Sequence, residues 1–402
     1  MTIFRILKRN TGGFMSKLIL SIPKETQEDE TRVALTPKHV RGLTGLFKEI
    51  RVQDGAGSRA GFTNGDFRRA GARIVSKLGR LLGGTDIVLQ VKRPDPRMEK
   101  EHVKLYPEKA AVVGFLDPQV VNTAHLGAYA KFGVTGFSFE LMPQTLQTQA
   151  MHATAAMSRV TGEVVIAEAA GHFGDLKGKN VLVIGLGNAG LAAVKHAKSL
   201  GANVNALSTS TTHKAELETL GITFELLQDE RGKTISAADA LNLQRNRIAE
   251  FLATQVQDVI VCAARRVDPQ TTPLLITEDM QTEIIPGTLV YDLTKSSGVG
   301  NFEGGEYGED STIGNGILFR SKKGYPKAVP EVASPLYAAC ASKFLRALLA
   351  WKPAKERTEA ILKTCVTAGG LINPVCTGRV PANQFNTAAL LTLHELRERA
   401  RA

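Results

Sequence analysis

The chain has 402 residues, 43% of them hydrophobic, and a formal net charge of +11. This length accommodates two ordinary domains, and the apolar fraction is ordinary for a soluble globular protein. The basic residues are scattered and few aromatic side chains lie among them, which argues against a nucleic-acid-binding module.

The N-terminal half of the chain alternates predicted strands and helices. Residues 1–15 are basic and lack the apolar core of a secretory signal, so we expect a disordered tail or a mis-annotated start before Met15. Pro37 takes the first position of one predicted helix, and Asn64 is expected to cap another. Strands are predicted at 18–22, 50–53, 86–92 and 111–116, and helices at 37–46 and 64–70. This alternation indicates an α/β domain with a mainly parallel sheet.

Residues 180–201 carry the strongest motif of the chain. A β-branched run at 181–184 predicts a buried strand, and apolar residues at helical spacing predict a helix that ends at Gly201. Between them stands a glycine-rich turn, with Gly185 for the tight turn, Gly187 for backbone approach to a pyrophosphate and Gly190 for close helix packing. The residues expected to bind the dinucleotide are Gly185, Gly187, Asn188, Ala189 and Gly190. The alternative is a tight turn that binds nothing.

The strand–helix pattern continues on both sides of this motif. The alanine-rich segment 150–173 predicts a long helix, and 228–247 predicts a surface helix or loop. Further strands are predicted at 204–207, 258–262 and 288–292, and further helices at 214–220 and 333–349, followed by a helical tail interrupted by Gly369, Gly370 and Pro374. We expect two Rossmann-like α/β domains with parallel sheets: 16–149 completed by 335–402, and an inserted nucleotide-binding domain at 150–334.

Cysteine usage and hydropathy set further limits. None of the four cysteines stands in a C-x-x-C pair, so no metal site is expected, and Cys262 is interpreted as core packing. The most apolar late segment, 336–351, contains Lys343 and Arg346 and is too short to span a bilayer. We therefore expect a cytoplasmic protein whose link to a membrane, if it has one, comes through a partner.

The cofactor preference depends on the end of the second strand of the nucleotide-binding unit. NAD sites usually carry Asp or Glu there to bind the ribose 2′-hydroxyl, but this chain has Ser208, followed by Thr209 and Ser210. No carboxylate repels a 2′-phosphate, and Lys214 lies nearby in sequence. We hypothesise relaxed specificity between NAD and NADP or a preference for NADP(H); the alternative is hydroxyls that simply bond the ribose.

Several short motifs together resemble the alanine dehydrogenase and proton-translocating transhydrogenase family, with the nucleotide-binding α subunit of the transhydrogenases as the closer relative. The matching segments are 22–26, 30–37, 54–57, 66–72, 91–94, 140–143, 149–151, 329–337 and 365–372. The resemblance implies binding of NAD(H), hydride transfer to NADP(H) held by a partner, and a membrane subunit that couples the transfer to proton movement. It also implies a homodimer that is peripheral to the inner membrane.

Two basic residues match the substrate-facing positions of the family. Arg32 and Lys92 follow predicted strands at the carboxyl edge of a sheet, where a guanidinium and an ammonium could hold a carboxylate between them. The alternative is a pair of surface ion-pair residues. Alanine dehydrogenases carry histidine at the position of Asp117 and aspartate at that of Ser296, so their acid–base chemistry is not expected here.

The family resemblance assigns the remaining site residues. In the loop before the long helix, the transhydrogenase pattern of arginine, glutamine, aspartate and serine falls on Gln144, Gln149, His152 and Ala155, and only Gln149 is kept. His152 could bond the nicotinamide carboxamide, or it could be a helix-surface histidine. Hydride transfer between nicotinamides needs orientation more than an acid or a base.

The strand ends of the nucleotide-binding unit complete the predicted site. Ala263 and Ala264 are expected to line the cofactor, and Asp292 and Leu293 to lie against the nicotinamide ribose. Arg265 and Arg266 could face phosphate or a substrate carboxylate, or be solvated loop residues.

The function predicted is a transhydrogenase-α-like oxidoreductase that uses NAD or NADP. One alternative is a soluble amino-acid or opine-type dehydrogenase that uses Arg32 and Lys92 on a carboxylate substrate. The other is a nucleotide-binding regulator that has lost catalysis.

Overall fold

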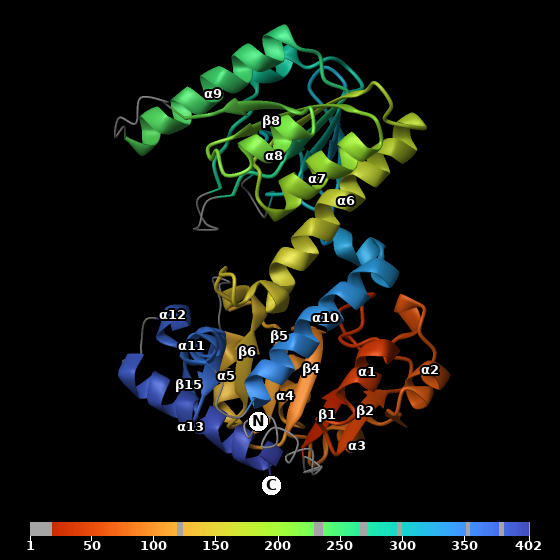
Figure 1. Ribbon diagram of the computed structural model, residues 1–402, viewed down its shortest axis with the longest axis vertical. Coiled ribbons are helices and arrows are strands. Elements are labelled where there is room, and N and C mark those ends of the chain that lie inside the picture. The colour runs from red at the N-terminus through yellow and green to blue at the C-terminus, as the bar shows by residue number, and fades with distance from the viewer. Residues whose placement is uncertain are drawn as a thin grey trace, which may run out of the picture. The chain divides into compact units, whose positions relative to one another are not determined.

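The computed structural model describes residues 18–118, 124–228, 236–265, 272–295, 300–350, 354–377 and 382–401. The expected tail at 1–15 lies outside this range, as do Arg266 and Ser296. The chain divides into two compact units, one formed by Met1–Thr154 with Pro330–Ala402 and the other by Ala155–Val329. Figure 1 shows each unit as a sheet with helices packed against it.

The first unit contains an eight-stranded sheet in the order β15-β14-β6-β5-β4-β1-β2-β3. Strands β1 to β6 run parallel, and β14 joins β6 antiparallel. The strands are β1 (Ile19–Ile22), β2 (Glu49–Gln53), β3 (Arg73–Val75), β4 (Ile87–Lys92), β5 (Ala111–Phe115), β6 (Thr135–Ser138), β14 (Cys365–Ala368) and β15 (Leu371–Ile372). The central strands β4 and β5 are buried almost throughout, as apolar runs covered on both faces should be.

Helices cover this sheet. They are α1 (Pro37–Leu43), α2 (Asn64–Arg69), α3 (Leu78–Leu82), α4 (Glu99–Val103), α5 (Ala124–Lys131), α10 (Pro330–Leu349), α11 (Lys355–Lys363), α12 (Pro374–Thr377) and α13 (Ala382–Arg401). Helix α10 packs Phe344 edge-on against Phe139, with ring centroids 5.2 Å apart, and so ties the C-terminal segment to the end of β6.

Three local predictions for this unit are wrong. Thr63 caps α2 in a capping box with Asp66, while Asn64 bonds the Asp54 carboxylate and the Gly55 N–H instead. Helix α10 begins at Pro330 rather than near residue 333, because Pro330 supplies the favoured first-turn proline and Pro335 is accommodated inside the helix. The predicted helical tail contains the hairpin β14–β15, which turns at Gly369 and Gly370 with φ of +55° and +76°.

The second unit contains a seven-stranded sheet in the order β12-β13-β11-β10-β7-β8-β9, parallel except for β12. Its strands are β7 (Asn180–Ile184), β8 (Asn203–Ser208), β9 (Thr223–Leu226), β10 (Val259–Cys262), β11 (Leu289–Asp292), β12 (Asp310–Ile313) and β13 (Ile317–Arg320). Its helices are α7 (Asn188–Ser199), α8 (Lys214–Thr219) and α9 (Ala237–Thr254), with α6 (Ala153–Phe173) leading in. The polar segment predicted as a surface helix or loop therefore contributes to α9.

The predicted α/β class with two mainly parallel sheets is confirmed. Cys262 is fully buried in the apolar cluster of the second unit, as predicted. Among the helices that the structure describes, none is both long enough and apolar enough to traverse a bilayer.

Candidate functional site

The turn between β7 and α7 needs glycine at two positions for internal reasons. Gly185 adopts φ of +95°, and a Cβ there would stand 2.6 Å from the backbone nitrogen of Ala264. A Cβ on Gly190 would stand 1.8 Å from the carbonyl oxygen of Gly185. Both glycines therefore allow backbone to pack on backbone, whether or not a ligand is bound.

Gly187 differs, because a Cβ built on it would meet nothing within 4 Å. It precedes α7 in an extended conformation and offers no side chain to cap the first N–H groups of that helix. The amides at the start of this 12-residue helix, on Asn188, Ala189 and Gly190, are thus available to an anion that approaches over Gly187. This open backbone fits a pyrophosphate.

The predicted strand-end residues meet at the same edge of the second sheet. Ile184 pairs in register with Leu207 on one side and with Cys262 on the other, and Cys262 pairs with Asp292. The residues that follow these strands, including Ala263 and Leu293, therefore end level with the glycine turn. Because the chain crosses to opposite sides of β7, this edge is the switch point at which α/β sheets bind ligands.

The carboxylate of Asp292 serves its own loop. It accepts hydrogen bonds from the backbone nitrogens of Thr294, Lys295 and Phe302 at 2.9, 3.1 and 3.0 Å. A Cβ on Gly300 would stand 2.3 Å from the same carboxylate, so the loop closes tightly around it. Asp292 thus shapes the rim, and its neighbour Leu293 is left at the edge.

Asn301 supports the rim and was not identified from the sequence. Its buried amide accepts from Ala264 N–H at 2.9 Å and donates to the carbonyls of Ala264 and Pro273 at 2.9 and 2.8 Å. The segment after β10 is held in place by these bonds. The partners lie 37 and 28 residues away along the chain, so no local pattern indicates the contact.

Gly162 was also missed. It lies in the middle of α6, where a Cβ would stand 2.0 Å from the carbonyl oxygen of Ala189. Within the second unit α6 therefore packs backbone to backbone against the start of α7. A glycine in the interior of an alanine-rich helix was the available signal for such a contact.

Hydroxyl groups gather at the end of β8. Ser208 is buried and its hydroxyl accepts the N–H of Ser210 at 3.2 Å, while Thr209 is exposed. The hydroxyl of Ser210 bonds that of Thr212 at 2.7 Å. Lys214 lies 4.0 Å from Glu218 in an exposed pair, which restrains it little.

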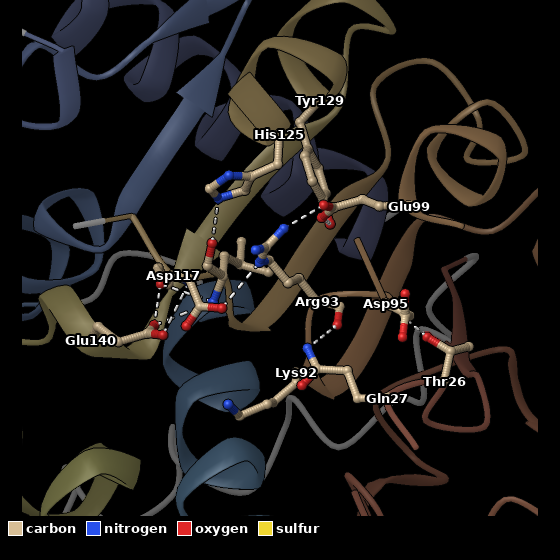
Figure 2. A network of polar contacts seen from close by, with 12 residues as sticks. Thr26, Gln27, Lys92, Arg93, Asp95, Glu99, Asp117, His125, Tyr129 and Glu140 are labelled. Atoms are coloured by element: carbon tan, nitrogen blue, oxygen red, sulfur yellow. Dashed lines mark hydrogen bonds and ion pairs between the residues drawn. The ribbon is translucent and has the colours of Figure 1, made fainter. Parts of the chain in front are cut away.

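In the first unit, Arg32 is buried rather than exposed. Its Nε and Nη2 donate to the two carboxylate oxygens of Glu30 at 2.7 and 2.6 Å, and its side chain is 5% exposed. Within the described residues no side chain pairs with the ammonium of Lys92, which extends from the end of β4 in Figure 2. The alternative of two surface ion-pair residues therefore does not describe either of them.

Glu25 links these two positions. Its carboxylate accepts the N–H of Val91 at 2.7 Å and that of Lys92 at 3.1 Å. Burial, together with the nearby negative charge of Glu30, raises the pKa of Glu25 to about 8. A carboxyl group that titrates near neutral pH thus lies beside the predicted basic pair, and sequence reasoning gave Glu25 no role.

A second polar network surrounds Arg93, as Figure 2 shows. Its Nη1 donates to Glu99 at 2.5 Å and its Nε to Asp117 at 3.0 Å. Asp117 adopts φ of +50°, and Glu140 accepts its N–H at 3.1 Å. Burial raises the pKa of Glu140 to about 7. Asp117, which occupies the position of the alanine dehydrogenase histidine, is thus held in an ion pair.

The loop before α6 presents its predicted residues differently. Gln149, on the 3₁₀ turn Gln149–Met151, is exposed, as is Gln144. His152 is only 9% exposed, so the interpretation as a helix-surface histidine is wrong; it ends the 3₁₀ turn and lies buried before α6. Thr148 fixes the loop from within by donating to the carbonyl of Pro143.

Comparison with known proteins gives a consistent result. Residues 21–161 match the family described as alanine dehydrogenase/PNT, N-terminal domain, and residues 149–374 match its C-terminal domain. The chain is 30% identical over 387 residues to the first of the polypeptides that make up NAD(P) transhydrogenase subunit alpha of Rhodospirillum rubrum, a match that covers 90% of this chain and 99% of the relative. Alanine dehydrogenase of Halomonas elongata is 28% identical over 78% of this chain and 83% of its own length. The crystal structure of a transhydrogenase from Sinorhizobium meliloti aligns with a TM-score of 0.76 and 27% identity, over 88% of this chain and 99% of that one.

Proposed function

Since the chain belongs to the alanine dehydrogenase/PNT family, we propose that it is an oxidoreductase of the transhydrogenase α-subunit type. It binds a nicotinamide dinucleotide at the carboxyl edge of its second unit and exchanges hydride with a nicotinamide nucleotide held by a partner. The observation that carries this proposal is the open backbone at Gly187, set before uncapped amides at the start of α7.

The residues of the chain position the cofactor, and the nicotinamide ring itself supplies the hydride chemistry. The first amides of α7 hold the pyrophosphate, and Gly185 and Gly190 let that helix start directly over the strand. Asn301 and Asp292 keep the neighbouring rim in shape. No proton donor or base is required, which agrees with an Asp117 carboxylate that is committed to Arg93.

One observation favours the dehydrogenase alternative. The Lys92 ammonium, which pairs with no side chain in the described ranges, and the nearby Arg32 offer positive charge for a carboxylate substrate. The same two residues would serve a keto or amino acid. Turnover therefore has to be tested with and without such substrates.

Binding is tested by calorimetry with NADH and NADPH on the intact chain and on Gly187→Val. The variant should keep its thermal stability, because its side chain meets open space, and should lose at least tenfold in affinity, because the valine occupies the path of the pyrophosphate. Gly171→Val is the matched control, since Gly171 is also open but lies in α6. Equal affinity in all three proteins would contradict the site.

Turnover is tested by reduction of an NAD analogue, with the NADP(H)-binding subunit of a transhydrogenase relative present or absent. Hydride transfer only with that subunit supports the proposed activity. Oxidation of the cofactor only with a keto acid, with or without ammonia, would support the dehydrogenase. Binding without any turnover would support a regulator.

We also propose a homodimer that associates with a membrane subunit. This extends the subunit names of the relatives to this chain. Light scattering on the purified chain should give twice the monomer mass, and the chain should sediment with vesicles only when they contain the membrane subunit of a relative.

A further inference from the structure

Arg265 lies on the rim of the proposed dinucleotide site and has no role so far. Its Nη2 donates to the carbonyl oxygen of Leu293 at 3.3 Å, so its side chain reaches from the segment after β10 to the end of β11. The residue before it, Ala264, lies against the glycine turn, because a Cβ on Gly185 would stand 2.6 Å from the Ala264 nitrogen. Arg265 therefore follows the turn on its β10 side.

The charge of Arg265 is not neutralised by a partner. Within the described residues no carboxylate pairs with its guanidinium, whose one hydrogen bond there goes to a neutral carbonyl. The neighbouring Asp292 directs its carboxylate to the backbone of its own loop. The ammonium of Lys295 also donates to a carbonyl, that of Gly304, at 2.9 Å. This side of the rim is therefore positively charged.

The strand order decides which half of a dinucleotide meets this charge. In folds of this type the adenosine ribose lies at the end of the second strand, here β8, and the pyrophosphate lies at the first helix, here α7. The remaining half of the molecule then extends over the ends of β10 and β11. That half carries the nicotinamide ring.

We propose that Arg265 makes this site prefer the reduced over the oxidised dinucleotide, an inference that rests on the proposed function. The oxidised ring carries a positive charge that the reduced ring lacks, while the two phosphates are the same in both forms. A fixed guanidinium repels only the oxidised ring. Since the side chain is exposed and screened, the expected preference from this residue is about threefold to tenfold.

The test compares the dissociation constants of NADH, NAD⁺ and ADP-ribose for the intact chain, Arg265→Gln and Lys198→Gln. Lys198 is the matched control, because its ammonium also donates to one carbonyl, that of Gly221, but lies in the last turn of α7 at the opposite edge of the sheet. The ratio of the NAD⁺ to the NADH dissociation constant should fall about threefold to tenfold in Arg265→Gln and stay unchanged in Lys198→Gln.

The other outcomes each overturn the inference. Equal weakening of NADH, NAD⁺ and ADP-ribose would show that Arg265 binds phosphate instead. An unchanged ratio would show that it lies away from the ring. A second measurement needs no variant: the ratio in the intact chain should shrink as salt is raised from about 0.01 to about 0.5 M, and a constant ratio would contradict an exposed charge as its source. Failure of the intact chain to bind any of the three ligands would instead remove the proposed function itself.

Discussion

Gly190 and Gly185 touch through backbone alone, because a Cβ on Gly190 would stand 1.8 Å from the Gly185 carbonyl oxygen. Gly190→Ala should therefore force α7 away from β7 and lower the free energy of unfolding by about 1–3 kcal/mol, as overpacking does. Urea unfolding measures this. Gly171→Ala is the control and should not destabilise the chain, since Gly171 faces open space within α6. Equal unfolding midpoints would contradict the close contact.

Arg93 and Arg97 leave the same loop but should differ in their contribution to stability. Arg93 is 14% exposed and pairs with Glu99, which is 5% exposed, so Arg93→Ala leaves a buried carboxylate without its partner. We expect a loss of about 3–5 kcal/mol in urea unfolding. Arg97 is 78% exposed in its pair with Asp95, and Arg97→Ala should cost less than about 1 kcal/mol. A similar loss for both variants would show that the Arg93 network does not stabilise the unit.

Glu25 should make stability depend on pH in an uncommon direction. Its pKa is about 8 in the folded chain against 4.5 for the unfolded one, so between these values the folded chain holds a proton that the unfolded chain has released. The contribution of Glu25 to stability therefore falls as pH rises from about 5 to 8. Glu25→Gln cannot titrate, so its stability relative to the intact chain should increase over this range. A difference that is constant with pH, measured by urea unfolding, would refute the raised pKa.

Ser208 should leave the site tolerant of NADP(H). Because no carboxylate stands at the end of β8, we expect NADPH to bind at least as tightly as NADH, and Ser208→Asp to weaken NADPH by about tenfold or more through repulsion of the 2′-phosphate. Thr219→Asp, at the far end of α8, adds the same charge and should leave the ratio unchanged. Calorimetry that found NADH at least tenfold tighter in the intact chain would reject the hypothesis.

Short and half-exposed strands were not predicted. Strands β3, β9 and β12 each have three or four residues with intermediate or exposed side chains, so they lack the apolar run that made β7 or β10 recognisable. The hairpin β14–β15 was predicted as helical tail because its two strands become stable only by pairing with β6, more than 220 residues earlier in the chain.

By itself the sequence determined the α/β class, the strand–turn–helix unit around Gly187 and the family, because each depends on residue spacing within a few turns of the chain. Only the tertiary structure decided how charges and amides are paired. The bonds of Glu25 to Lys92, of Asn301 to Ala264 and of Arg93 to Asp117 join residues 67, 37 and 24 positions apart. Such partners meet because parallel strands end at a common edge, and no local pattern specifies which side chains face each other there.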